Sequence, residues 1–503
     1  MNTTSLPIRV LRSLPLVATV ALAGTAVARP ADDLPKRPEE LTFAPLQFTA
    51  PKAKDYRSTL SDGTPVYLAP SKEFPLVNLT MTFKGGGFLD PAEATGLAGM
   101  TAAMVRSGGT ATVKPADLDE RFDFLAARAA VGARGFAVTA SLNALTSNFD
   151  EAFALFMDML RNPGFDAERL AVQKGEALEA MKQRNDDADS IQGREWANIA
   201  FGPDHHEARQ MTAASLDAIT PDAMRSMHAR IMHPGNVIIA VSGDFEPAQM
   251  LAKLEQAFAG WAKGEPVADP PAPTADLTPG VRYVQKDIPQ GKVTIGLRTL
   301  ERDDPDFIPM LVMNDILGGG GFSSRIMQSV RSNEGLAYSA GSRLESNPWF
   351  DGQLRAAFQS KSPSVVRAIK LIDDEFRRMR SEPVTEGELA TSKASFIETF
   401  PGNFSSKDRM LEIFVGDEWS RRPDGYWETF REKVQAVTPD DITRVANKYL
   451  DPSRMAVLVV GNWADIYGNA GENANELFPA DRPATEIPLK DPLTLKPISG
   501  SGG

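Results

Sequence analysis

Apolar residues recur along this chain with two different periods. Apolar and polar positions alternate over Val77-Asn-Leu-Thr-Met-Thr-Phe83, which predicts a half-buried strand, and residues 135–142 predict another strand. Helical spacing over residues 149–160 and 166–184 predicts amphipathic helices. Residues 237–243 are apolar almost throughout, which predicts a strand buried on both faces.

The two halves of the chain repeat one another. Three landmarks recur at one offset of 218 residues (438 − 220, 452 − 234 and 461 − 243), namely Thr220-Pro-Asp222 with Thr438-Pro-Asp440, Pro234 with Pro452, and Gly243 with Gly461. Self-similarity at a fixed period indicates duplication. Strands and helices are mixed without regular alternation, so we predict an α+β fold of two homologous domains, each a mainly antiparallel sheet packed with helices.

The predicted domain boundaries follow from composition. Residues 264–280 carry five prolines, which predicts a linker between a first domain at 58–263 and a second at 281–490. Residues 29–57 are rich in proline and charge, which predicts an extended arm.

The N-terminal residues 1–28 predict a signal peptide. Arg9 and Arg12 precede a short apolar run at 14–23, and Ala26-Val27-Ala28 is a small-x-small cleavage site. About ten apolar residues cannot span roughly 30 Å of hydrocarbon. We therefore expect a periplasmic protein without membrane insertion.

Composition excludes several classes of function. The 503 residues carry a net charge of −12, which argues against a nucleic-acid partner because such proteins present basic patches. The chain has no cysteine, which excludes a disulfide framework and a thiol nucleophile.

The most informative stretch is residues 317–339. Four glycines, Gly318, Gly319, Gly320 and Gly321, predict backbone that leaves helix and strand and lets a ligand approach closely. The next residues predict a helix that ends at Gly335, followed by a strand from Leu336, with one helix face formed by Phe322, Ile326, Met327 and Val330. Arg331 and Tyr338 then lie at the two ends of a tight helix-to-strand turn.

This stretch resembles the C-terminal signature of the pitrilysin/insulinase family of zinc peptidases, which includes the mitochondrial processing peptidases. The family form is a Gly-rich loop, then F-S-S-R-L, then V-R-E-x-x-G-L-A-Y. This chain reads Phe322-Ser-Ser-Arg-Ile and Val330-Arg-Ser-Asn-Glu-Gly-Leu-Ala-Tyr338. The resemblance implies two homologous α+β halves over nearly all of residues 40–480, and it implies that Arg331 and Tyr338 bind substrate.

The metal motif of active relatives is missing from the first half. In those relatives a helix carries H-x-x-E-H, whose histidines bind zinc and whose glutamate is the general base. Gly99 and Ala103 stand at the two histidine positions of this chain, and Ala102 stands at the position of the base. Glu176 and Glu179 lie about where a third ligand would be, and alone they are ordinary helix-face carboxylates. A catalytic zinc needs three protein ligands, so we expect no cofactor bound by this chain.

Four histidines remain as candidate ligands. His205 and His206 form one cluster with Asp204 and Glu207, which we interpret as a solvated loop, with an isolated metal site as the alternative. His228 and His233 lie within and at the end of a predicted helix, where core or capping roles are expected.

These observations lead to one hypothesis and two alternatives. Arg331 offers a fork of charged donors and Tyr338 a hydroxyl, which together could hold a peptide carbonyl or the oxyanion formed from it. We hypothesise the non-catalytic, substrate-binding subunit of a heteromeric periplasmic peptidase, whose zinc lies in a homologous partner subunit. The alternatives are a peptide-binding pseudoenzyme or scaffold of the cell envelope, and a peptidase active on its own.

Overall fold

The computed structural model describes residues 37, 41, 47–471, 473–477 and 483–498. The predicted signal peptide and most of the predicted arm lie outside these residues. The described end of the arm contains a short 3₁₀ turn at Ala53–Asp55. Within the described residues, no helix is both long and apolar enough to cross a membrane.

The first half builds one six-stranded sheet with the strand order β1-β2-β6-β3-β5-β4. Its strands are β1 (Arg57–Thr59), β2 (Pro65–Pro70), β3 (Leu76–Lys84), β4 (Arg128–Arg134), β5 (Ala137–Leu145) and β6 (Val237–Gly243). Its helices are α1 (Leu97–Ser107), α2 (Pro115–Phe124), α3 (Phe149–Arg161), α4 (Ala167–Lys182), α5 (Ala188–Phe201), α6 (Ala213–Asp217), α7 (Pro221–Ile231) and α8 (Pro247–Phe258). The alternating burial of β3 and the complete burial of most of β6 confirm the patterns read from the sequence.

The second half repeats this arrangement with the order β12-β7-β11-β8-β10-β9. Its strands are β7 (Gly280–Gln285), β8 (Gln290–Arg298), β9 (Ala337–Glu345), β10 (Gln353–Lys361), β11 (Ala456–Gly461) and β12 (Thr485–Glu486). Its helices are α9 (Phe307–Asn314), α10 (Arg325–Met327), α11 (Val365–Ser381), α12 (Glu386–Thr399), α13 (Lys407–Trp419), α14 (Tyr426–Ala436), α15 (Pro439–Tyr449), α16 (Trp463–Gly468) and α17 (Asn473–Leu477).

Five strands of each sheet match in order and direction, namely β2-β6-β3-β5-β4 in the first and β7-β11-β8-β10-β9 in the second. The pair β2 and β6 is parallel, as is the pair β7 and β11, and the remaining pairs among these strands are antiparallel. The predicted duplication and the α+β fold class are therefore confirmed.

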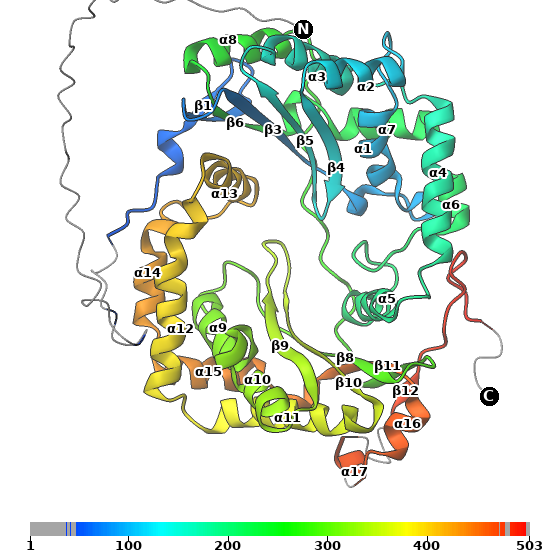
Figure 1. Ribbon diagram of the computed structural model, residues 1–503, viewed down its shortest axis with the longest axis vertical. Helices are drawn as coiled ribbons and strands as arrows, with labels where there is room; N and C mark the ends of the chain where they lie inside the picture. Colours follow the sequence, from blue (N-terminus) through cyan, green and yellow to red (C-terminus); the bar gives the residue numbers. More distant parts are fainter. Residues whose placement is uncertain (1–36, 38–40, 42–46, 472, 478–482, 499–503) are drawn as a thin grey trace, which may run out of the picture. The chain divides into compact units, whose positions relative to one another are not determined.

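Each sheet has one face in a hydrophobic core. Val77, Leu79, Met81 and Phe83 of β3 are at most 1% exposed and pack among residues of α1, α3 and α7. Burial of such side chains stabilises the fold by roughly 25 cal/mol per Å² of apolar surface removed from water. Figure 1 shows these helices on one side of the first sheet, with α13 on the other side.

The halves exchange one helix each. The α5 helix of the first half packs on the second sheet, where Ile191, Trp196 and Ala200 meet Leu458 and Val460. The α13 helix of the second half packs on the first sheet through Met410, Leu411, Phe414 and Val415. Each sheet therefore carries its own helices on one face and a helix of the other half on the opposite face.

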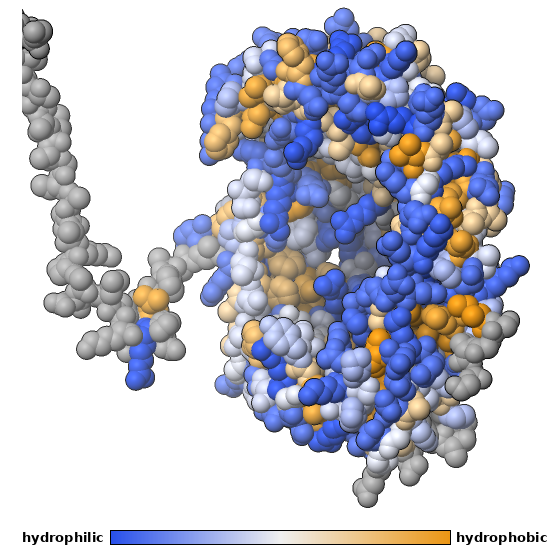
Figure 2. Space-filling model, turned by 45° about the vertical axis from the view of Figure 1, so that its right-hand side comes forward, coloured by the Kyte–Doolittle hydropathy of each residue, from blue (hydrophilic) through white to orange (hydrophobic). Residues whose placement is uncertain are grey.

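Residues 264–279 of the proline-rich segment between the halves contain no helix or strand, and β7 begins at Gly280. The segment is held by hydrogen bonds. The amide of Gly264 donates to His233 Nδ1 over 3.1 Å, and the Asp269 carboxylate pairs with Lys84 at 2.6 Å. Figure 2 shows one face of the molecule, which is largely hydrophilic and is hollowed at its centre.

Candidate functional site

The glycine run does not form the open loop that the sequence predicts. Gly318 and Gly319 end a π-helical turn, Asp315–Gly319, that continues α9. Gly318 is buried, and a Cβ atom there would collide with the backbone nitrogen of Ser342 in β9. Gly318 therefore allows close contact between two segments of this chain. Gly321 is exposed with open space beside it, and its φ of +63° lies in the left-handed region that favours glycine.

The helix after the glycines ends as predicted, but one of its faces differs. Gly335 adopts a φ of +65°, and its amide donates to the Arg331 carbonyl over 3.0 Å. Ile326 and Val330 are fully buried, whereas Phe322 is 66% exposed. Phe322 lies in a separate 3₁₀ turn, Gly321–Ser323, before the helix starts, so it does not share the core face.

Arg331 lies between two exposed aromatic rings. Its guanidinium carbon is 4.6 Å from the ring centre of Phe322 and 5.0 Å from that of Tyr338. Tyr338 is 86% exposed. Neither the guanidinium nor the Tyr338 hydroxyl has a hydrogen bond or ion pair with any other described residue. The stack orients the cation while its N–H donors stay open, because cation–π contact uses the ring faces.

A partly buried ion pair anchors the same helix. Arg325 contacts both carboxylate oxygens of Glu388 on α12, at 2.6 and 2.9 Å. The bond from Arg325 lowers the pKa of Glu388 to about 2, and the amide and hydroxyl of Thr385 act in the same direction. Arg331 itself lies in a π-helical turn, Gln328–Asn333, a conformation that is frequent at functional sites.

The helix that would carry the zinc motif is α1. Gly99 and Ala103 lie on its partly exposed side, and no other atom lies within 4 Å of where a Gly99 Cβ would be. Ala102 is fully buried. Two positions thus retain the geometry of a ligand pair, one turn apart on one side of a helix, without any ligating atom.

Comparisons with known proteins find relatives named as zinc proteases and relatives named as non-peptidases. Residues 218–396 match the family model described as Peptidase M16 inactive domain. A non-peptidase homolog of Helicobacter pylori, YmxG, is 23% identical over 407 residues, which cover 79% of this chain and 92% of the relative. An uncharacterized zinc protease of Streptomyces coelicolor is 27% identical over 337 residues, 64% of this chain and 71% of the relative.

A solved structure extends the match to most of the chain. The peptidase M16 inactive domain from Pseudomonas fluorescens superposes with a TM-score of 0.73 at 25% identity, and the match covers 80% of this chain and 97% of that one. The chain is similar over most of its length to proteins of the M16 peptidase family. This is the pitrilysin/insulinase family that the motif around Arg331 and Tyr338 resembles.

The carboxylates considered as a third ligand, Glu176 and Glu179, are exposed. Glu179 pairs with Lys182 at 2.6 Å, and Glu176 accepts a hydrogen bond of 3.4 Å from Gln173. Both contacts lie within α4. The described part of the chain contains no group of three histidine, aspartate or glutamate residues placed to hold a metal ion.

The His205–His206 segment is not the solvated loop that the sequence suggests. The His206 side chain is only 5% exposed, and its ring packs against His205, Phe88, Phe136 and Phe350. Both of its ring nitrogens lack a hydrogen-bond partner among the described residues. Burial lowers the pKa of His206 to about 4, helped by His205 and Arg209. Aromatic residues far away in sequence cover this loop, and local sequence gives no signal of them.

The other two histidines have structural roles. The Nε2 atom of His228 lies 2.7 Å from the carbonyl of Leu160 in the core, and burial lowers the pKa of His228. His233 Nδ1 accepts the Gly235 amide over 3.1 Å and caps the following turn.

Proposed function

We propose that this protein is the non-catalytic, substrate-binding subunit of a heteromeric zinc peptidase. In this proposal Arg331 and Tyr338 donate hydrogen bonds to the peptide carbonyl, and to the oxyanion that forms at a zinc site in a homologous partner. The signal-like residues 1–28 favour a periplasmic location for the pair.

The observation that carries the proposal is an oriented cation with open donors. Arg331 contacts the rings of Phe322 and Tyr338 and has no ion pair among the described residues. A side chain that is ordered but unpaired is suited to a ligand that arrives from outside. An extended peptide carbonyl meets this description, because a planar guanidinium presents several donors to one acceptor.

The absence of ligating atoms at Gly99, Ala102 and Ala103 is the reason to place the zinc in a partner. Arg331 and Tyr338 can stabilise a developing negative charge, but they cannot activate water as a metal does. The chemistry therefore requires a second polypeptide with an intact H-x-x-E-H helix.

The proposal is tested by measuring peptide hydrolysis by the pure chain, and then by its mixture with an H-x-x-E-H homologue from the same cell. We expect no turnover by the chain alone and zinc-dependent turnover by the mixture, well above that of the homologue alone. Turnover by the homologue that this chain does not change would contradict a subunit role. Peptide binding by the isolated chain in that case would support the binding-protein alternative.

A further inference from the structure

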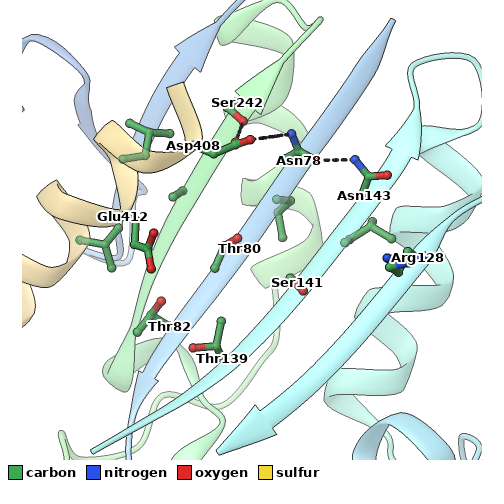
Figure 3. A pocket seen from close by; sticks show the side chains of 15 residues that line it. Asn78, Thr80, Thr82, Arg128, Thr139, Ser141, Asn143, Ser242, Asp408 and Glu412 are labelled. Atoms are coloured by element: carbon green, nitrogen blue, oxygen red, sulfur yellow. Dashed lines mark hydrogen bonds between the residues drawn. The ribbon is translucent and has the colours of Figure 1, made fainter. Parts of the chain in front are cut away.

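A cavity of about 430 Å³ lies between the first sheet and α13, away from Arg331 and Tyr338. Its floor is formed by side chains that stand directly opposite one another on β3 and β5. The facing pairs are Asn78 with Asn143, Thr80 with Ser141, and Thr82 with Thr139. Figure 3 shows these side chains on one face of the sheet, with Glu412 of α13 to their left. The volume is in the range of small-molecule sites.

The hydroxyl groups of the floor are available for a ligand. Thr80, Thr82, Thr139 and Ser141 form no side-chain hydrogen bond with any described residue. They are partly or fully exposed to solvent. Each hydroxyl can donate or accept, which matches the N–H and C=O groups of a peptide backbone.

Charges of opposite sign flank the hydroxyl groups. On the α13 side, Asp408 accepts hydrogen bonds only from the neutral groups of Asn78 and Ser242, and Glu412 has no partner among the described residues. On the β4 side, Arg128 has no ion pair within the described part of the chain. Figure 3 shows Glu412 and Arg128 on opposite sides of the floor.

These groups define the chemistry of an occupant. It carries a cation that meets Glu412 and Asp408, an anion that meets the guanidinium of Arg128, and hydrogen-bonding groups between them. Leu411 and Val415 add an apolar wall that suits an aliphatic side chain. Adjacent strands lie about 4.8 Å apart, so β4 and β6 are separated by roughly 14 Å, and three extended residues span about 10 Å.

We propose that this cavity binds a short peptide of about three residues with both ends free. Its ammonium group lies against α13 and its carboxylate lies against Arg128. Hydrolysis of a longer peptide creates such ends, so the ligand belongs to the chemical class of peptidase products. The proposal concerns the isolated chain and does not rest on the proposed partner subunit.

The test is calorimetric titration of the full chain with the tripeptide Ala-Leu-Ala, its N-acetylated form and its C-amidated form. We expect the free tripeptide to bind at least tenfold more tightly than either blocked form. In the Glu412→Gln variant, the free and the acetylated tripeptide should bind with equal affinity. In the Arg128→Gln variant, the free and the amidated tripeptide should bind with equal affinity. Val415→Trp, which fills the cavity, should abolish binding.

The matched controls are variants at two exposed residues away from the cavity, Glu176→Gln on α4 and Arg225→Gln on α7. Both should bind the tripeptide with the affinity of the parent chain. Equal affinity for free and blocked peptides, or no binding at all, would overturn the proposal. Equal binding of a neutral trisaccharide would overturn it as well, because the charges would then have no role. Binding that survives Val415→Trp but is lost in Arg331→Ala would place the peptide at the other site.

Discussion

The two exchanged helices contact their sheets in different ways. Trp196 and Val415 are each the ninth residue of their helix (188 + 8 and 407 + 8), and both point at the sheet of the other half. The Trp196 ring lies against Gly296 of β8, and its Nε1 donates to Gln353 over 3.0 Å. At the corresponding place on β3, two residues from the strand's end as Gly296 is, Thr82 lines the cavity.

The difference shows how one architecture provides both a closed and an open contact. A large ring and a glycine fill the space under α5, so that face of the second sheet is buried. A valine and a row of hydroxyl side chains leave space under α13. The second half is thereby a packed support for Arg331 and Tyr338, and the first half retains a polar hollow.

Of the substitutions considered, one at Trp196 of α5 should change the stability most, and one at Val415 of α13 should change it much less. Trp196→Ala removes a 2%-exposed ring and its hydrogen bond, so we expect the free energy of unfolding to fall by about 3–5 kcal/mol. Val415→Trp places a ring in existing space and should cost less than about 1.5 kcal/mol. Urea denaturation measures both. Similar losses in the two variants would contradict the difference between the contacts.

Substitution by alanine should destabilise the protein at Gly318 and stabilise it at Gly99. Gly318→Ala forces a Cβ atom into β9, and we expect a loss of about 1–3 kcal/mol. Gly99→Ala adds a methyl group in open space within α1 and should stabilise the protein by about 0.5–1 kcal/mol. Thermal melting of the two variants against the parent chain tests this. A stabilising Gly318→Ala would show that the glycine turn is not packed.

Acid should weaken the aromatic contact around His206. The folded-state pKa of about 4 lies below the ordinary value of 6.5, so the unfolded chain binds this proton first and stability falls as pH falls from about 6.5 to 4. We expect His206 to account for about 2 kcal/mol of the loss between pH 7 and pH 5. Denaturation at pH 7, 6 and 5 should show a shallower slope for His206→Phe. An unchanged slope would mean that His206 is hydrated in the folded protein.

Sequence patterns predicted the elements better than the contacts between them. The alternation in β3 and the repeated Thr-Pro-Asp caps depend on neighbouring residues, and they identified the strands and the duplication. The burial of Gly318 depends on a strand that begins some twenty residues later, and that of His206 on Phe88 and Phe350. The cavity under α13 requires a helix from the other half. None of these long-range contacts leaves a periodic signal.

At the candidate site, too, the sequence indicated individual residues but not the contacts between them. The motif identified Arg331 and Tyr338, because both belong to one continuous stretch of sequence. Helical spacing predicts Phe322 on the same helix face as Ile326 and Val330. It cannot reveal that Phe322 lies in a separate turn, which ends before the helix starts after Ser324. Its contact with Arg331 became visible only in three dimensions.

The most direct test of the account is the rate of peptide hydrolysis by the mixture with the zinc-binding homologue, measured for Arg331→Ala. Loss of one such donor should lower kcat by about 100- to 1000-fold, corresponding to about 2.7–4 kcal/mol, while the stability of the chain changes little. The exposed Arg225→Ala, whose ion pair lies within α7, is the matched control and should keep the parent rate. Full activity with Arg331→Ala would contradict the claim that this chain completes the active site of its partner.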